Sequence, residues 1–337
     1  MAPRKTDDAS DPKAARAAAL EQKKIQKVAD ARECKNKSAK KKKPPAAQLG
    51  PRKQPENPLP KQHLEKPGHE DELAPAPRFR APDYKGSGKL DGMRALITGA
   101  DSGIGAAVAI AFAREGADVA LNYLEEEQED AQHVIQAIRD SGRKAVPLPG
   151  DIRDKAFCHQ LVEHAVRELG GLDALVNNAG KQVIAESLTE LPDDQWEATY
   201  NTNIHAMFWI TKAALKHMPA GSTIVNTTSI QGYNPNEMLI DYASTKAAIN
   251  NFSKGLGQQL APKGIRVNAV APGPIWTPLQ PSKGQPKDKL PHFGQNTPLG
   301  RAGQPTEVAP AFVFLTSPES SYVIGETLHV NGGIPTP

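Results

Sequence analysis

The sequence predicts an α/β domain over residues 91–337, built on a parallel sheet of about seven strands with helices on both faces. Two observations carry this prediction. Short apolar runs alternate with longer amphipathic stretches along the whole segment, and the connections between the runs have room for a helix. Each helical crossover returns the chain in the same direction, so the strands are expected to be parallel.

The individual elements follow from hydrophobic spacing and from the turn residues between them. We expect strands at residues 94–98, 118–122, 144–148, 172–176, 222–229, 264–270 and 327–330. We expect helices at residues 106–114, 125–140, 155–169, 193–217, 241–256 and 305–316. Residues 278–300 lack apolar periodicity, which is typical of a functional loop or lid. Trp276, His292 and Phe293 are candidates to line a pocket there.

A glycine-rich turn follows the first expected strand. Residues 98–105 read TGADSGIG, and a strongly helical run comes next. Glycines at 99, 103 and 105 would let backbone amides and a helix N-terminus approach a pyrophosphate closely. This placement between a strand and a helix indicates a dinucleotide-binding, Rossmann-type domain.

Polar residues stand at the carboxyl ends of the expected strands, where open parallel sheets bind their ligands. Asp151 is placed there to meet an adenine edge. The residues at these ends are Thr98, Asn122, Asp151, Asn178 and Ser229. Their common position predicts one ligand site along this edge of the sheet.

The choice between NADP and NAD depends on the end of the second strand. An acidic residue there would bind the ribose 2′-hydroxyl and favour NAD. Asn122 stands at that position and removes the repulsion against a 2′-phosphate. No arginine follows, residues 125–127 are all glutamate, and Asp101 and Ser102 supply no cation. We therefore favour NADP and keep NAD as the alternative.

Tyr242 and Lys246 are four residues apart on an expected helix and share one face. A neighbouring ammonium favours the phenolate, so we expect Lys246 to lower the pKa of Tyr242, with an oxidised nicotinamide as a second cation. Ser229 lies thirteen residues earlier, at the end of a strand. A Tyr–Lys pair at this spacing also occurs in helices that carry no chemistry, so the surroundings decide.

Asn203 lies inside the expected helix 193–217. Asparagine is unfavourable in the middle of a helix and usually signals a side-chain hydrogen bond. From the residues alone, a structural role in the core and a catalytic role are both open.

The N-terminal part is basic and poor in aliphatic residues. Residues 1–90 hold 22 Lys and Arg against 12 Asp and Glu, whereas the whole chain has a formal net charge of +3. We expect residues 1–48 to be disordered, because they cannot bury enough apolar surface to offset ordering. Their lysine run could contact nucleic acid or serve only as a solvated tail. Residues 49–90 are proline-rich and are expected to form an extended arm, not a packed unit.

Other features bound the class of protein. Cys34 and Cys158 are far apart and give no disulfide framework, which fits a reducing compartment. No apolar run approaches the length of a membrane helix, and no signal peptide is evident, so we expect a cytoplasmic protein. His63 and His69 have no partners at metal-ligand spacing, and we predict no metal site.

Together these residues resemble the short-chain dehydrogenase/reductase family over residues 89–333. Within it the chain is similar to a bacterial subgroup of NADP-dependent aldehyde reductases and general-stress oxidoreductases; the tail before Leu49 departs from that subgroup. The motifs are TGADSGIG at 98–105, NNAG at 177–180, Asn203, Ser229, YASTK at 242–246, PGPIWT at 272–277 and YKGSGKL at 84–90.

The resemblance implies an enzyme that transfers hydride between a nicotinamide cofactor and an aldehyde, ketone or alcohol. Tyr242 would be the general acid/base, Ser229 would orient the carbonyl, Lys246 would lower the tyrosine pKa and hold the nicotinamide ribose, and Asn203 would maintain a water-linked proton path. The predicted cofactor site comprises Gly99, Ser102, Gly103, Ile104, Gly105, Asn122, Asp151, Ile152, Asn178, Ala179, Gly180, Tyr242, Lys246, Pro272, Gly273, Ile275 and Thr277.

The resemblance also implies a homotetramer, with residues 49–90 lying across a neighbouring subunit. The alternative class is a cofactor-sensing or nucleic-acid-associated protein that acts through its basic tail. The presence of Ser229, Tyr242 and Lys246 together favours the enzyme, because a non-catalytic relative would not need all three.

Overall fold

The computed structural model describes residues 46–49, 53–66 and 68–336. The tail expected to be disordered, residues 1–48, lies outside the described residues except for its last three.

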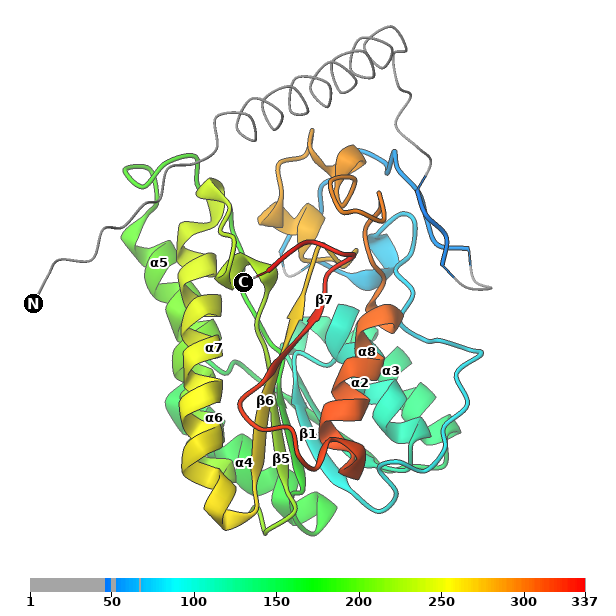
Figure 1. Cartoon of the computed structure of the whole chain (residues 1–337), viewed down its shortest axis with the longest axis vertical. Helices are drawn as coiled ribbons and strands as arrows, with labels where there is room; N and C mark the ends of the chain where they lie inside the picture. The colour runs from blue at the N-terminus through cyan, green and yellow to red at the C-terminus, as the bar shows by residue number, and fades with distance from the viewer. Residues whose placement is uncertain (1–45, 50–52, 67, 337) are drawn as a thin grey trace, which may run out of the picture. The chain divides into compact units, whose positions relative to one another are not determined.

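In the described part of the chain, the sheet has seven strands in the order β3-β2-β1-β4-β5-β6-β7 (Figure 1). Every neighbouring pair is parallel, which confirms the predicted fold class. The strands are β1 (Arg94–Thr98), β2 (Asp118–Tyr123), β3 (Ala145–Pro149), β4 (Ala174–Asn177), β5 (Thr223–Thr227), β6 (Arg266–Pro272) and β7 (Thr327–Val330). The order reverses beside β1, so the crevice next to β1 and β4 is where a ligand is expected.

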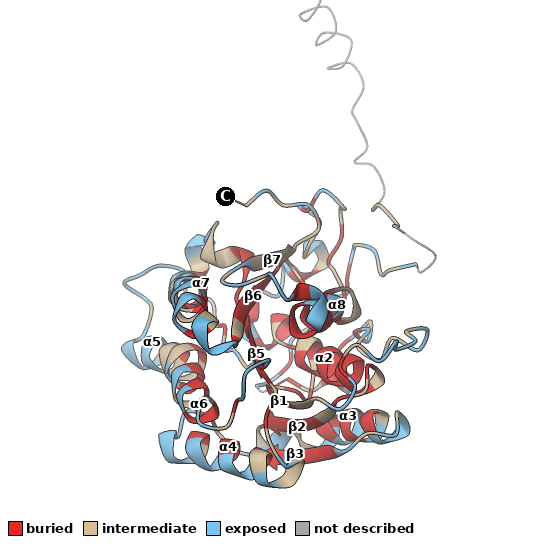
Figure 2. Ribbon diagram, turned by 60° about the horizontal axis from the view of Figure 1, so that its bottom comes forward, coloured by how far each residue is buried: buried red, intermediate tan, exposed pale blue. Residues whose placement is uncertain are grey.

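Helices cover both faces of the sheet, and Figure 2 shows the buried strands between the two layers. One layer holds α2 (Gly103–Arg114), α3 (Gln128–Asp140) and α8 (Pro305–Thr316). The other holds α4 (Lys155–Leu169), α5 (Asp193–Tyr200), α6 (Ala206–Ala214) and α7 (Ile240–Leu260).

The sheet buries side chains on both faces because strand residues alternate in direction. In β1, Ile97 belongs to the cluster under α2 and α8, and Leu96 belongs to the cluster under α4 and α6. Both are fully buried, and each such side chain contributes roughly 1.5–3 kcal/mol by leaving water. The two clusters hold the strand ends in register, and this register positions the polar residues at the edge of the sheet.

Residues 193–217, expected as one helix, form α5, a π-helical turn (Asn201–His205) and α6, which ends at Ala214. The π turn falls where Asn203 hydrogen-bonds outside its own helix. Single π turns inside helices occur frequently at functional sites.

The proline-rich arm is packed, so the expectation that it would not pack was wrong. Leu59, Leu64 and Leu73 are buried in one cluster with Trp276 and Leu290. Among the described residues between Leu59 and Leu73, the arm forms a short 3-10 turn, η1 (Glu70–Glu72), and is otherwise irregular. Aliphatic side chains that are spaced along an extended backbone can be buried without any regular secondary structure. Such widely spaced residues give no periodic pattern in a proline-rich sequence.

Trp276 and Phe293 belong to this arm cluster and do not line the cavity described below, which corrects their prediction as pocket residues. Trp276 is fully buried, and its Nε1 donates to the carbonyl of Pro75 at 2.8 Å. His292 does not line the cavity either; it ends a short turn, η8 (Leu290–His292). The loop of residues 278–300 therefore packs against the arm through Leu290 and Phe293.

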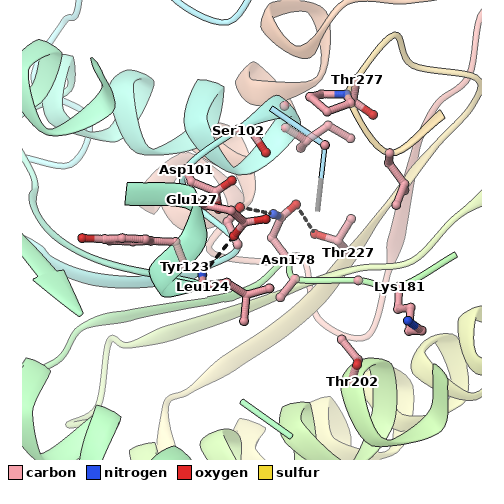
Figure 3. Close-up of a pocket in the computed structure, with 18 of the residues that line it drawn as sticks. Asp101, Ser102, Tyr123, Leu124, Glu127, Asn178, Lys181, Thr202, Thr227 and Thr277 are labelled. Carbon is pink, nitrogen blue, oxygen red and sulfur yellow. Dashed lines mark hydrogen bonds between the residues drawn. The ribbon is translucent and has the colours of Figure 1, made fainter. Parts of the chain in front are cut away.

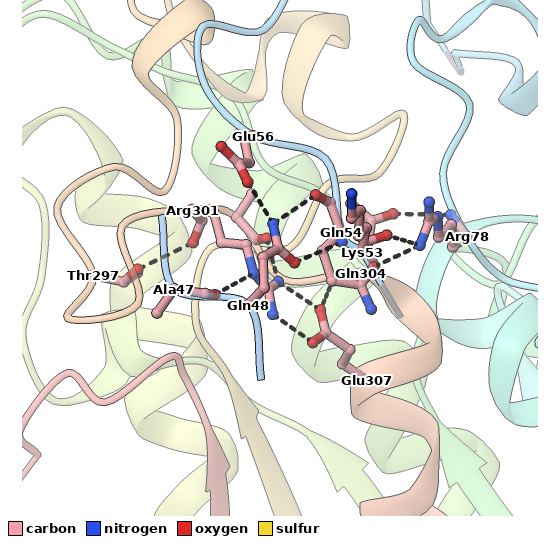
Figure 4. A network of polar contacts seen from close by, with 11 residues as sticks. Ala47, Gln48, Lys53, Gln54, Glu56, Arg78, Thr297, Arg301, Gln304 and Glu307 are labelled. Carbon is pink, nitrogen blue, oxygen red and sulfur yellow. Dashed lines mark hydrogen bonds and ion pairs between the residues drawn. The ribbon is translucent and has the colours of Figure 1, made fainter. Parts of the chain in front are cut away.

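A polar network fastens the beginning of the described chain to the start of α8 (Figure 4). The guanidinium of Arg301 is buried and pairs with Glu307 at 2.8 Å. The backbone amide of Ala47 donates to Leu299 O at 2.9 Å, and the amide of Arg78 donates to Gln304 Oε1 at 2.9 Å. The arm is thus joined to the helix that follows residues 278–300.

Cys158 is free and buried, and its thiol donates to Ile152 O at 2.9 Å. Cys34 lies outside the described residues. Among the residues that the structure describes, no helix has both the length and the apolar character needed to cross a bilayer.

Candidate active site

A cavity of about 680 Å³ lies at the carboxyl ends of the parallel strands (Figure 3). Its size falls within the roughly 300–1,000 Å³ that is typical of ligand pockets. The predicted residues that line it are Gly99, Ser102, Gly103, Ile104, Asn122, Asp151, Ile152, Asn178, Ala179, Gly180, Ser229, Tyr242, Lys246, Pro272, Gly273, Ile275 and Thr277. Gly105 and Asn203 do not line it.

The glycine-rich turn forms one wall because side chains have no room there. A Cβ added at Gly105 would lie 1.8 Å from Gly99 O, so this glycine brings α2 against the turn. Gly103 has a φ of 51° and would place a Cβ 3.0 Å from Thr277 Cγ2. The turn therefore brings the N-terminus of α2 to the cavity, as a phosphate-binding turn requires, and the amide of Gly103 is bonded there to Glu70 Oε2.

Asn178 connects the ends of three strands. Its Nδ2 donates to Gly99 O at 2.9 Å, and its Oδ1 accepts from Thr227 Oγ1 at 3.3 Å (Figure 3). Thr98 Oγ1 accepts from the amides of Asn178 and Ala179, at 3.0 and 3.1 Å. The side chain of Asn178 thus links the ends of β1, β4 and β5 at the base of the cavity.

Two further polar strand-end residues, Asn122 and Asp151, are also engaged within the protein. Asn122 Nδ2 donates to Leu148 O and to Gly150 O, each at 3.1 Å, and so joins β2 to β3. The carboxylate of Asp151 pairs with Arg153, whose Nε lies 2.8 Å from Asp151 Oδ2. The arginine lowers the pKa of Asp151, so this carboxylate stays ionised.

Carboxyl groups gather at what we call the glycine-turn end of the cavity, formed by residues 99–105 with Asn122 and Glu127. Asp101 and Glu127 lie side by side there (Figure 3). Burial raises the pKa of both groups, and the charge of Asp101 raises that of Glu127 further. In the sequence, these acids indicated only that the turn lacks cations.

Tyr242 lies on α7 and is buried in the cavity wall. Burial raises its pKa to about 12, and a hydrogen bond with Ser229 acts in the opposite direction. The ammonium of Lys246 lies 5.3 Å from the centroid of the phenol ring. For the protein's own side chains, the expected lowering of the Tyr242 pKa by Lys246 was wrong, because burial dominates the shift and only the Ser229 hydrogen bond opposes it.

Lys246 is buried beside Tyr242, and its ammonium donates to Thr227 O at 2.8 Å. Burial lowers its pKa to about 8. Its carbonyl accepts from Thr228 Oγ1 at 2.8 Å, so α7 is tied to the end of β5. This tie fixes the lysine and the tyrosine relative to the strand that ends in Ser229.

Asn203 is buried and satisfied within the protein, which agrees with the predicted side-chain hydrogen bond. Its Oδ1 accepts from Lys181 N at 2.7 Å, and its Nδ2 donates to Lys181 O at 3.0 Å and to Thr245 Oγ1 at 3.0 Å. A Cβ added at Gly180 would lie 3.8 Å from Asn203 Oδ1 and 3.6 Å from Lys246 Nζ. Asn203 thus positions the backbone beside the lysine without touching its ammonium.

The arm contributes residues that the sequence analysis missed. Lys66 and Gly68 line the cavity, and Glu70 Oε2 accepts from the amide of Gly103 at 2.8 Å. Burial raises the pKa of Glu70 to about 8. The only available signal was the aliphatic residues at Leu64 and Leu73 on either side, which indicate that this stretch is packed.

Within the part of the chain that the structure describes, no group of three or more His, Cys, Asp and Glu side chains is arranged to hold a metal ion. His69, assigned no role from the sequence, contacts Asp130 Oδ2 through Nδ1 at 3.2 Å.

The fold and the site together define a dinucleotide-binding α/β protein with serine, tyrosine and lysine at one cavity wall. A family model described as Enoyl-(Acyl carrier protein) reductase matches residues 99–335. The chain belongs to the short-chain dehydrogenase/reductase family.

Three relatives illustrate the similarity. The uncharacterized oxidoreductase YhxD of Bacillus subtilis is 55% identical over 281 residues, which are 82% of this chain and 94% of the relative. NADPH-dependent aldehyde reductase 1, chloroplastic, of Arabidopsis thaliana is 46% identical over 81% of this chain and 96% of its own. The crystal structure of a short chain dehydrogenase from Burkholderia cenocepacia in complex with NADP is 36% identical, with a TM-score of 0.68 over 73% of this chain and 98% of that one.

Proposed function

We propose that this protein is an NADP(H)-dependent oxidoreductase that reduces aldehydes or ketones to alcohols. The observation that carries the proposal is the placement of Tyr242 in the wall of the strand-end cavity, with Ser229 as its hydrogen-bond partner and Lys246 beside its ring. This arrangement suits the transfer of a proton to a carbonyl oxygen. Tyr242 would be the general acid, Ser229 would bind the carbonyl, and Lys246 would supply a positive charge.

Two findings support NADP as the cofactor. The glycine-rich turn and the start of α2 line the cavity, where a helix N-terminus suits the pyrophosphate of a dinucleotide. The Arabidopsis relative is named for NADPH, and the Burkholderia structure contains NADP. Titration with NADPH and NADH measures the preference, and we expect NADPH to bind more tightly.

The residues of the chain would act as follows. Burial keeps the Tyr242 phenol protonated near neutral pH, as a group that gives its proton to a carbonyl oxygen must be. Ser229 would hold that oxygen through its hydroxyl. Lys246, fixed on Thr227 O, would bind the nicotinamide ribose. When bound, NADPH supplies the hydride.

Replacement of Tyr242 tests the proposal. We expect Tyr242→Phe to reduce kcat for aldehyde reduction by about 10²–10⁴-fold, because the proton donor is lost. The dissociation constant for NADPH, measured by fluorescence titration, should stay within about twofold, since a phenylalanine ring fills the same space. Tyr322→Phe is the matched control, because Tyr322 is fully exposed and far from the cavity wall. Unchanged turnover by Tyr242→Phe would refute the assignment.

We also propose that the protein is a homotetramer, as the family resemblance implies. Large apolar side chains are exposed on α5, α6 and α7, at Trp196, Phe208 and Ile240, which supports an interface on these helices. Light scattering coupled to size-exclusion chromatography measures the mass, and a monomeric mass at micromolar concentration would contradict this assembly.

A further inference from the structure

Three lysines from separate segments surround what we call the lysine end of the cavity, formed by Lys66, Lys181, Leu279 and Gln280. Lys66 belongs to the arm, Lys181 follows β4, and Lys283 lies on the neighbouring loop. Lys66 and Lys181 line the cavity. Figure 3 places Lys181 on the opposite side of Asn178 from Asp101 and Glu127, so the cavity is acidic at one end and basic at the other.

Backbone contacts hold these segments together. Lys66 Nζ donates to Gln182 O at 3.3 Å, and Gln182 Nε2 donates to Gly284 O at 2.7 Å. The amide of Ile184 donates to Lys283 O at 3.2 Å. The lysines are therefore brought near one another by a fixed arrangement of arm, strand end and loop.

The charges of Asp241 and Asp151 act on Lys181 from a distance, but no carboxylate of a described residue is in contact with the three lysines. Among the described residues, none of the three lysines forms an ion pair. Lys66 is exposed at the cavity edge, and desolvation by its surroundings, followed by the charges of Lys181 and Lys283, lowers its pKa to about 8. Like charges held together without an ion pair are unfavourable, and an anion bound between them removes that cost.

The lysine end is also close to the catalytic group. Gln182, whose carbonyl accepts from Lys66, is two residues from Gly180, where an added Cβ would lie 3.6 Å from Lys246 Nζ. Gln280 is buried in the same end, and its Oε1 has no hydrogen-bond partner. This end therefore offers positive charge and a free acceptor to a polar ligand beside Lys246.

We propose that the substrate carries an anionic group, a carboxylate or a phosphate, which Lys66 binds while Lys181 and Lys283 supply further positive charge. This inference rests on the proposed carbonyl reduction and specifies its substrate class. The same oxyanion chemistry could come from a phosphate of the cofactor, and the experiment separates the two sources.

The experiment compares two para-substituted benzaldehydes, the anionic 4-carboxybenzaldehyde and the neutral 4-methylbenzaldehyde, both with NADPH. We expect Lys66→Met to lower kcat/KM for the carboxylate about tenfold or more, because a charge-assisted hydrogen bond is lost. The value for the methyl compound should change less than about twofold, since the methionine keeps the apolar stem. Lys66→Arg should retain most of the preference for the carboxylate.

Lys61→Met is the matched control, because Lys61 is an exposed arm lysine that does not line the cavity. An equal loss of kcat/KM for both aldehydes in Lys66→Met would show that Lys66 has only a structural role, and this would overturn the proposal. A weaker NADPH affinity without a change in substrate preference would assign the lysine to a cofactor phosphate and overturn it too.

Binding alone tests the subsite if the enzyme reduces neither aldehyde. We expect 4-methylbenzoate to bind the NADPH complex and to change the NADPH fluorescence, with an affinity about tenfold weaker in Lys66→Met. Such binding without turnover would reject the proposed reaction and retain the anion subsite. Equal affinity in both proteins would reject the subsite itself.

Discussion

The two ends of the cavity are built in different ways. The glycine-turn end comes from the turn after β1, the start of α2 and the neighbouring strand ends, and its floor is held by Asn178. The lysine end comes from segments that are far apart in the sequence: the arm around Lys66, the residues after β4, and residues 279–284. One end depends on a local motif in a regular sheet, and the other depends on long-range packing of irregular segments.

This difference divides the two tasks that we propose for the site. A rigid turn of backbone amides recognises phosphate groups that every dinucleotide carries. Irregular segments can vary without disturbing the sheet, and binding residues concentrate on such segments. We therefore expect changes at the glycine-turn end to affect cofactor binding and changes at the lysine end to affect the substrate.

The largest effect is expected from Gly105→Ala at the glycine-turn end. The new Cβ would lie 1.8 Å from Gly99 O and 2.6 Å from Asn178 Nδ2, and a backbone carbonyl cannot move aside easily. We expect a loss of roughly 3 kcal/mol in the free energy of unfolding. NADPH binding, followed by fluorescence titration, should be lost with it.

Gly255→Ala provides the control for this substitution. Gly255 also lies within a helix, α7, but a Cβ there meets nothing within 4 Å. Alanine should stabilise that helix by up to about 1 kcal/mol. If Gly105→Ala bound NADPH as tightly as Gly255→Ala, the turn would not be the cofactor site.

The same difference explains how much could be predicted from the sequence. The sheet, its direction and most element boundaries follow from alternating apolar runs, and the glycine-turn end follows from the spacing of residues 98–105. The strand ends were identified because parallel topology alone places them at one edge. Ser229, Tyr242 and Lys246 lie at the cavity wall as this argument required.

The lysine end could not be predicted in this way. Its parts meet only after folding, and no periodicity links Lys66 to Gln182 or Leu64 to Pro281. The direction of the Tyr242 pKa shift was also wrong, because desolvation depends on packing that a helical spacing does not specify. Trp276 was misplaced for the same reason, since its partner Pro75 lies in the arm.

A smaller effect, confined to the lysine end, is expected from Leu64→Ala. Leu64 is buried in the arm cluster, and its amide donates to Pro281 O at 3.2 Å. We expect a loss of about 2–3 kcal/mol in the free energy of unfolding, measured by urea titration, because a cavity is left. KM for the aldehyde should rise more than the dissociation constant for NADPH, since the arm beside Lys66 loosens. Leu49→Ala, at an exposed arm residue, is the control, and equal changes in the two constants would mean that the ends are not separate.

The smallest effect is expected at Glu70, where the arm contacts the glycine turn. This arm residue places Oε2 on the amide of Gly103 at 2.8 Å, while its Oε1 is buried without a partner. Burial, opposed by the hydrogen bond from Gly103 and assisted by the charges of Asp101, Asp130 and Asp71, raises its pKa from 4.5 to about 8. The native state therefore favours the protonated carboxyl, which contributes stability that is fully present below pH 4.5 and is lost as the pH rises to about 8.

Glu70→Gln imitates the protonated carboxyl and should remove this loss. We expect the melting temperature of the natural protein to fall relative to that of the variant between pH 5 and pH 8.5, with no further divergence above that range. Asp101 and Glu127 titrate in both proteins, so the difference between the two curves isolates Glu70. Glu72→Gln, an exposed acid two residues away, should follow the natural protein. If the melting temperatures of Glu70→Gln and the natural protein changed in parallel with pH, ionisation of Glu70 would not affect stability. The proposed pH-dependent coupling between the arm and the glycine turn would then be rejected.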